Sequence, residues 1–357
     1  MGLDEKYNDK YSNCAETLAI LFLVGFVIWP WIKEAWNQTT DHLIRWMTGY
    51  EEVIQVGGVS LLFKEKEDMT GILHDIQDQS RELARLLGPP VYQGRILVDL
   101  HGKLRAQGGQ LRTQTHFRPW RILELPNRKP SVHVIRHELV HAFYQSDSWL
   151  TCVPKQAAEG LAEAVTSELG REGIPYLIPE YYPYYLSGLS GLMGFYGHKS
   201  NTLALNNIFY SITALFFYQL NQQEPGLYTR LLNERPPKNV TWCEYLQIVV
   251  NHSSKPQEFI DMINGYHSLG LLSHAIYAIP VRLDSNPIPS VLLFIPSLSQ
   301  IRQRTLPVTI SDHNNENKNQ MILFEQGVGQ YFTNGLQVGN LRFRIHVDGV
   351  LMKTDIN

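Results

Sequence analysis

The pattern of apolar and polar positions between residues 51 and 270 predicts strands followed by helices. Strands are expected where short apolar runs are bounded by turn residues, and helices where apolar residues recur every three or four positions. The predicted strands are Glu51–Glu65 (two strands around Gly57-Gly58), Arg95–Gly102 and Pro119–Pro126, the last near a sheet edge because prolines flank it. The predicted helices are about Glu67–Gly88, Val132–Tyr144 with Ser131 as N-cap, Pro154–Leu169, Asn206–Gln223, Thr241–His252 and Pro256–Tyr266.

From about Ile276 the pattern changes to short β-rich segments separated by turn residues. Leu341–Val347 alternates strictly between apolar and polar residues, as a strand with one buried face does. Asn334-Gly335 and Asp348-Gly349 are dipeptides typical of β-hairpin turns. These features predict a C-terminal all-β module, of the sandwich type, over residues 274–357.

The N-terminal part of the chain contains its longest uncharged run, Thr17–Ile32. As a helix, these residues would be about 24 Å long, somewhat shorter than a hydrocarbon core of about 30 Å. Trp29, Trp31 and Trp36 gather at one end of the run, where indole rings favour a membrane interface. We therefore expect a single membrane anchor at about residues 15–32, of undetermined orientation; the alternative is a buried helix of a soluble domain.

Composition and charge narrow the class of protein. Hydrophobic residues make up 44% of the 357 residues and charged residues 18%, as in an ordinary folded protein. The formal net charge is −3 and no block of Lys and Arg occurs, so nucleic acid is not expected as a partner. The basic residues are interpreted as solvated surface. The three cysteines form no disulfide framework and are interpreted as buried or incidental thiols.

The motif with the clearest chemistry is His137-Glu138-Leu139-Val140-His141, which has the form H-E-x-x-H. With 13 histidines in the chain, chance would produce it on the order of 0.02 times. On a helix, His137 and His141 point the same way and can share one zinc ion. Glu138 lies beside them, placed to take a proton from a water on the metal.

A catalytic zinc site needs a third protein ligand and one open position. The helix predicted downstream offers Glu159, Glu163 and Glu168. Because Glu159 and Glu163 are four residues apart, they share a helix face. One of them can bind zinc while the other accepts the free N–H of a ligating histidine.

H-E-x-x-H followed closely by E-G-x-A-E resembles the gluzincin metallopeptidases, which include thermolysin-like and aminopeptidase-N-like enzymes. The similarity is greatest to the compact members called peptidase MA-like. It covers Ser131–Leu169 well and extends more weakly to about Leu232. The resemblance implies a zincin-like α+β fold, Glu159 as the third metal ligand and Glu163 as the support of the first histidine.

The resemblance also implies a tyrosine that opens a later helix and helps to hold the oxyanion. Tyr210 is the candidate, although a tyrosine on an apolar helix is often simply part of the core. His198 is a competitor for the same role. His133 falls on the face of the two motif histidines, one turn earlier. We expect it outside the metal site, because three histidines along one straight helix cannot converge on one ion.

Taken together, the sequence predicts residues 1–50 as a segment with the membrane anchor, 51–273 as a zincin-like metallopeptidase domain and 274–357 as the β module. The predicted function is a membrane-anchored peptidase that hydrolyses peptide bonds with a zinc-activated water and Glu138 as general base. Its substrate would be a peptide or protein. The alternative is a catalytically inactive binding or scaffolding protein on the same fold, tethered to a membrane.

Overall fold

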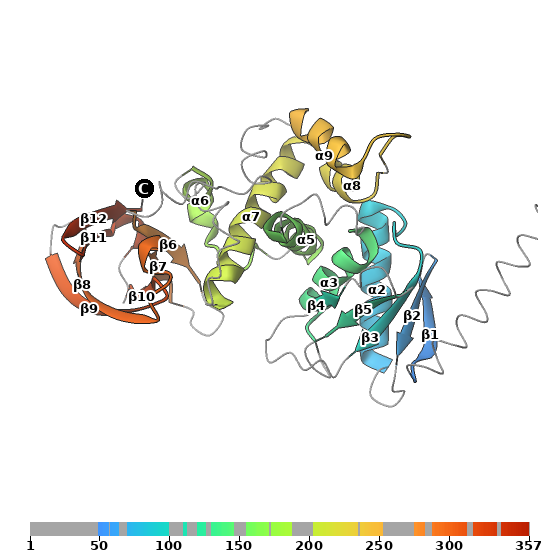
Figure 1. Cartoon of the computed structure of the whole chain (residues 1–357), viewed down its shortest axis with the longest axis horizontal. Helices are drawn as coiled ribbons and strands as arrows, with labels where there is room; N and C mark the ends of the chain where they lie inside the picture. The colour runs from blue at the N-terminus through green and yellow to red at the C-terminus, as the bar shows by residue number, and fades with distance from the viewer. Residues whose placement is uncertain are drawn as a thin grey trace, which may run out of the picture.

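A computed structural model of the chain describes residues 49–56, 58–63, 70–99, 110–112, 120–125, 130–145, 155–170, 173–187, 203–234, 236–252, 275–282, 288–312, 317–333 and 337–356. Within these ranges the chain combines helices with two separate sheets (Figure 1). Mixed helix and sheet, with an all-antiparallel sheet at the C-terminus, is the coarse architecture that the sequence predicts.

The helices agree with the predicted ones to within a few residues, apart from the short α6 and α8, which the sequence did not predict. They are α2 (Thr70–Leu87), α3 (Val132–Tyr144), α5 (Lys155–Gly170), α6 (Tyr182–Ser187), α7 (Leu203–Gln223), α8 (Leu227–Leu232) and α9 (Trp242–Asn251), with short 3-10 helices η1 (Pro179–Tyr181), η3 (Pro296–Leu298) and η4 (Val338–Asn340). The strands are β1 (Glu51–Val56), β2 (Val59–Phe63), β3 (Arg95–Asp99), β4 (Gln110–Arg112), β5 (Trp120–Glu124), β6 (Tyr277–Val281), β7 (Ser290–Phe294), β8 (Gln303–Ser311), β9 (Asn317–Glu325), β10 (Val328–Phe332), β11 (Arg342–Val347) and β12 (Val350–Asp355). The helix predicted over Pro256–Tyr266 lies outside the described residues.

The first sheet has the order β1-β2-β3-β5-β4. Strands β2, β3 and β5 are parallel, whereas β1 and β4 run antiparallel to their neighbours. Among the described strands β5 lies second from the end of the sheet, beside the three-residue strand β4, so it is near an edge as predicted but is not the edge strand itself. Since β5 runs only from Trp120 to Glu124, Pro119 and Pro126 occupy none of its ladder positions and do not prevent pairing on both sides.

Helix α3 lies in the middle of the helical layer. It packs against α2 on one side and α5 on the other, and α5 in turn packs against α7 (Figure 1). Leu139, Val140 and Phe143 of α3 are fully buried in the core that these helices share with the sheet. The helix that carries the two motif histidines is therefore fixed on several sides.

Two arginines hold α3 in place, so the interpretation of the basic residues as solvated surface is wrong for them. Arg136 is buried and donates to Gln79 Oε1 of α2 at 2.7 Å and to the carbonyl oxygen of Thr166 in α5 at 3.1 Å. Arg121 of β5 is also buried and donates to the carbonyl oxygen of Ala142 at 2.7 Å, near the C-terminal end of α3. Each guanidinium therefore connects α3 to neighbouring elements through buried hydrogen bonds.

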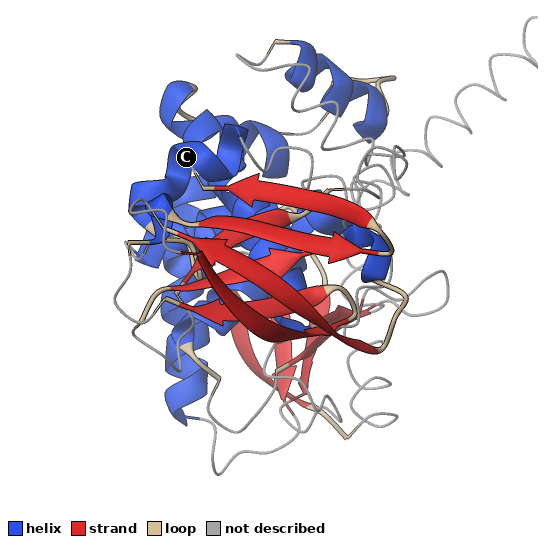
Figure 2. Cartoon of the chain, turned by 90° about the vertical axis from the view of Figure 1, so that its left-hand side faces the viewer, coloured by secondary structure: helices blue, strands red, loops and turns tan. Residues whose placement is uncertain are grey.

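The C-terminal strands form one antiparallel sheet of order β12-β11-β8-β9-β10-β7-β6 (Figure 2). The prediction of an all-β module is confirmed, but the sandwich is not. Hydrogen bonds connect the described strands from β6 to β12 in a single sheet, and its first and last strands, β12 and β6, contact each other. The predicted hairpin at Asp348-Gly349 joins β11 to β12, and both residues have positive φ, as a type I′ turn requires. In β11, Arg342, Arg344 and His346 are exposed and alternate with buried apolar residues.

Three tyrosines of the η1–α6 segment connect the helices to the C-terminal sheet. The hydroxyls of Tyr184 and Tyr185 donate to the carbonyl oxygens of Ala278 and Pro280 in β6, at 2.8 and 2.6 Å. The hydroxyl oxygen of Tyr181 accepts a hydrogen bond from the backbone N–H of Gly339 at 2.8 Å. Residues of β6 and β7 also belong to the core of the helical layer. The C-terminal sheet is thus packed against the helices.

The predicted membrane anchor lies outside the described residues. None of the helices in the described part of the chain has the length and apolar character needed to cross a membrane. Cys243 on α9 is exposed and disulfide-bonded, so the interpretation of the cysteines as buried or incidental thiols is wrong for this residue. The other two cysteines lie outside the described residues.

Candidate metal centre

Helix α3 carries both motif histidines and begins at a capped N-terminus. The hydroxyl oxygen of Ser131 accepts a hydrogen bond from the backbone N–H of Val134 at 3.3 Å. Four residues make slightly more than one helical turn, so His137 and His141 project from the same face. Their Nε2 atoms lie 3.1 Å apart and their ring planes meet at 75°.

Glu159 of α5 completes a triangle with the two imidazoles. Its Oε2 atom lies 3.2 Å from Nε2 of His137 and 3.3 Å from Nε2 of His141. The corners of a tetrahedron are about 1.6 times as far from one another as from its centre, so zinc bonds of about 2.0–2.1 Å need ligand atoms about 3.3–3.4 Å apart. The observed separations of 3.1, 3.2 and 3.3 Å fit that requirement. These three residues could hold a metal ion.

The far side of each imidazole faces a hydrogen-bond acceptor. Nδ1 of His137 lies 3.1 Å from Oε2 of Glu163, and Nδ1 of His141 lies 2.5 Å from Oε1 of Gln145. A neutral imidazole that donates from Nδ1 presents a lone pair at Nε2. Two lone pairs and the carboxylate of Glu159 then point at one another, which is unfavourable unless a cation lies between them. Two imidazole nitrogens and a carboxylate oxygen suit zinc.

The charges around the triangle also favour a cation. Burial opposes ionisation of Glu159 and Glu163, but the neighbouring histidines lower the pKa of both carboxyl groups, that of Glu163 to about 2. Burial would lower the pKa of His137, yet hydrogen bonds to the same two carboxylates raise it well above its usual value. A proton on His137 or a divalent cation at the triangle can supply the positive charge that the two carboxylates require.

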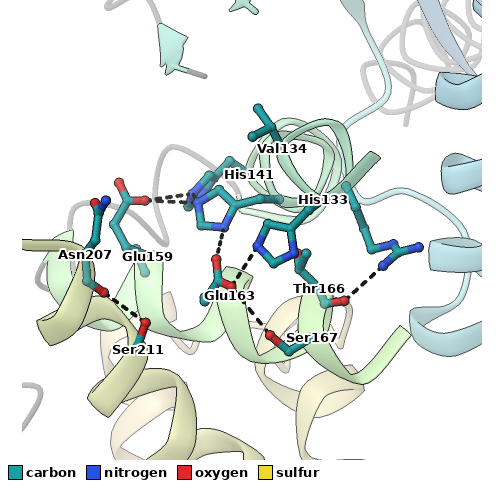
Figure 3. Close-up of polar contacts among 12 residues, drawn as sticks. His133, Val134, His141, Glu159, Glu163, Thr166, Ser167, Asn207 and Ser211 are labelled. Atoms are coloured by element: carbon teal, nitrogen blue, oxygen red, sulfur yellow. Dashed lines mark hydrogen bonds and ion pairs between the residues drawn. The ribbon is translucent and has the colours of Figure 1, made fainter. Parts of the chain in front are cut away.

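Glu163 supports His137 from outside the triangle, one turn after Glu159 (Figure 3). Its other oxygen, Oε1, lies 2.8 Å from Nε2 of His133, and the Ser167 hydroxyl donates to it at 3.4 Å. His133 therefore contacts the support of the first histidine rather than the triangle, as expected for the third histidine of a straight helix.

Glu138 is buried in α3, directly after His137 in the chain. Its negative charge lies close enough to His137 to help raise the pKa of that imidazole. A carboxylate in this position has the chemistry of a general base for a water bound next to the two histidines.

The other sequence candidates are less directly connected to the triangle. Tyr210 is half-buried on α7, one turn before Thr213, which packs against Gly160 beside Glu159. Its role in holding an oxyanion stays a prediction. Glu168 lies further along α5, where it accepts a hydrogen bond from Asn221 at 3.2 Å, and is not part of the cluster. His198 lies outside the described residues.

One residue that contacts the triangle was not identified from the sequence. Gln145 contacts His141, and its position four residues after that histidine could have indicated a place on the same helix face.

Comparisons with known proteins assign no family. No protein-family model matches the chain, and no curated protein matches it. Among solved structures, an aminopeptidase N family protein from Idiomarina loihiensis is 12% identical over 86% of this chain and 69% of that chain, with a TM-score of 0.30. A TM-score this low supports no conclusion about the fold or the activity, so the function is argued from the geometry of the site.

Proposed function

We propose that this protein is a zinc-dependent peptidase of the gluzincin type, with His137, His141 and Glu159 as the metal ligands. The observation that supports it best is the triangle of ligand atoms, 3.1 to 3.3 Å on each side, with an acceptor at Nδ1 of both imidazoles. In the described part of the chain the cluster has three protein ligands. The fourth tetrahedral position would be left for water, as in catalytic rather than structural zinc sites.

The chemistry divides between the metal and the side chains. Zinc, when bound, would lower the pKa of a water to about 7 and polarise the substrate carbonyl. Glu138 takes the proton from that water and passes it to the leaving amine. Glu163 holds the Nδ1 proton of His137, which keeps Nε2 free to bind metal. Tyr210 is the candidate donor to the oxyanion.

A peptide is the substrate class that fits the surroundings of the triangle. Strand β4 is the last strand of the first sheet among the described residues, and it contacts α3. An extended peptide could add to such a sheet edge through main-chain hydrogen bonds. This would bring a peptide bond next to the helix that carries His137 and His141.

The proposal is tested by incubating the purified protein with a diverse peptide pool, with and without a zinc chelator. We expect cleavage that the chelator abolishes and added zinc restores. Glu159→Gln, which weakens one ligand, should lower both the zinc content and the cleavage. Zinc binding without any cleavage would instead favour the alternative, an inactive binding or scaffolding protein.

We also propose that a helix at about residues 15–32 anchors the protein in a membrane. This proposal rests on the sequence alone. The uncharged run Thr17–Ile32 and the tryptophans at its end support it. The orientation of the anchor is left open.

A further inference from the structure

Gln145 forms a bridge between two of the proposed ligands, which come from different helices. It is the C-cap residue of α3 and its side chain is completely buried. Its Oε1 atom lies 2.5 Å from Nδ1 of His141. Its Nε2 atom donates to the carbonyl oxygen of Ala158 at 3.0 Å, and Ala158 directly precedes Glu159 in α5.

The hydrogen bonds of Gln145 are consistent in only one orientation of its amide. A carbonyl oxygen can only accept, so the Ala158 contact requires the NH₂ group on that side. The amide oxygen then faces His141 and requires a proton on Nδ1. With the proton there, Nε2 of His141 carries a lone pair directed at the triangle. The backbone of α5 thereby selects the tautomer of a histidine on α3.

We propose that Gln145 is a positioning residue of the metal centre: it sets the tautomer of His141 and holds it in register with Glu159 before the ion binds. The inference rests on the proposed function, since it assumes that the triangle binds zinc. Other buried glutamines can stabilise the fold, but Gln145 contacts a ligand histidine and the peptide group next to a ligand glutamate. Its loss should therefore affect metal binding as well as stability.

The two ligand histidines have supports of different charge. Glu163 supports His137 with an anionic carboxylate, whereas Gln145 supports His141 with a neutral amide. The carboxyl groups of Glu138, Glu159 and Glu163 already surround the site. A neutral amide fixes the second imidazole without adding a fourth negative charge to a buried position. It also supplies the N–H that a carboxylate would lack for the Ala158 carbonyl.

The test compares Gln145→Met with Gln79→Met in the full chain. Both substitutions remove a buried amide of similar size that contacts α3, but Gln79 binds Arg136 and no proposed ligand. Zinc affinity is measured by competition with a chromophoric chelator, and ligand geometry by the absorption bands of the cobalt-substituted protein. We expect Gln145→Met to weaken zinc binding about 10- to 100-fold and to change the cobalt bands. Gln79→Met should leave affinity within about twofold of the wild type, even if its melting temperature falls.

A measurement on the unsubstituted protein covers the case in which Gln145→Met does not fold. Nitrogen-15 NMR of the zinc-free protein above neutral pH reports which ring nitrogen of His141 carries the proton. We expect Nδ1–H; an Nε2–H tautomer would overturn the inference. If the Gln145→Met protein folds and binds zinc as tightly as the wild type, the positioning role of Gln145 is wrong, while the peptidase proposal is unaffected. Absence of zinc binding by the wild type would overturn the proposed function itself.

Discussion

Arg136→Met should destabilise the protein strongly, although it replaces a charged side chain with an apolar one of similar length in the core. Methionine keeps much of the volume of Arg136, which is only 7% exposed, but loses the guanidinium. The substitution leaves Gln79 Oε1 and the Thr166 carbonyl oxygen without their donor. Hydrogen bonds to a charged group contribute about 1.5–3 kcal/mol each, so losing both should cost about 3–6 kcal/mol. The contact with Glu82, at 3.5 Å and partly exposed, adds little.

This cost is measurable as a shift in thermal unfolding. At about 2–4 °C per kcal/mol for a domain of this size, the melting temperature should fall by roughly 6–24 °C, measured by circular dichroism. The matched control is Arg81→Met on α2, where the Arg81 side chain is 64% exposed and pairs with Asp78 one turn away on the same helix. That pair should contribute less than about 0.5 kcal/mol. If Arg136→Met melts within about 2 °C of Arg81→Met, the role assigned to Arg136 is wrong.

Three further predictions address other parts of the chain. Gly160→Ala would place a Cβ atom 2.4 Å from Thr213 Cγ2, so the free energy of unfolding measured with urea should fall by about 1–3 kcal/mol. Adding Thr213→Ala should recover part of this loss, and an unchanged free energy of unfolding in Gly160→Ala would contradict the packing. The pKa of Glu163 is lowered from 4.5 to about 2, so the ionised carboxylate stabilises the fold above pH 4.5, and this stabilisation is lost as the pH falls to 2. The difference in melting temperature between the wild type and Glu163→Gln should therefore shrink between pH 5 and 2, and a constant difference would refute this. The double substitution Leu23→Arg and Val27→Arg should shift the full chain from the membrane pellet to the supernatant in carbonate extraction, because each arginine costs about 2.5–3.5 kcal/mol in a membrane. A wild-type protein found in the supernatant would argue against the anchor.

Local signals predicted the helix that carries the motif well. Ser131 can cap a helix, and neither Gly nor Pro interrupts the residues from Val132 to Tyr144, so the predicted and observed ends of α3 agree. The hairpin at Asp348-Gly349 was predictable for the same reason, since a two-residue turn depends on the residues that form it. The glycine of E-G-x-A-E has a physical explanation in the structure, because Gly160 lets α7 approach α5 closely at Thr213.

Features that depend on long-range packing could not be predicted. Strand β4 has three residues, too few for an alternating pattern, so its place beside β5 at the end of the sheet could not be predicted. The burial of Arg136 depends on Thr166, thirty residues away in the chain. Residue types and helical spacing predicted the two histidines of the triangle, whereas the choice of Glu159 over Glu163 came from the resemblance to gluzincin metallopeptidases. The support of the triangle by Gln145 was not predictable, because the acceptor at Ala158 becomes visible only when α3 and α5 are packed together.

The central claim is that His137, His141 and Glu159 hold a zinc ion whose bound water loses its proton to Glu138. The most direct measurement compares zinc content and peptide cleavage of the wild type and Glu138→Gln. Glutamine keeps the shape of the side chain but cannot accept the proton. We expect one zinc per chain in both proteins, with the rate constant of the variant at least about 100-fold lower. A Glu138→Gln protein that retains zinc and cleaves at the wild-type rate would contradict the account.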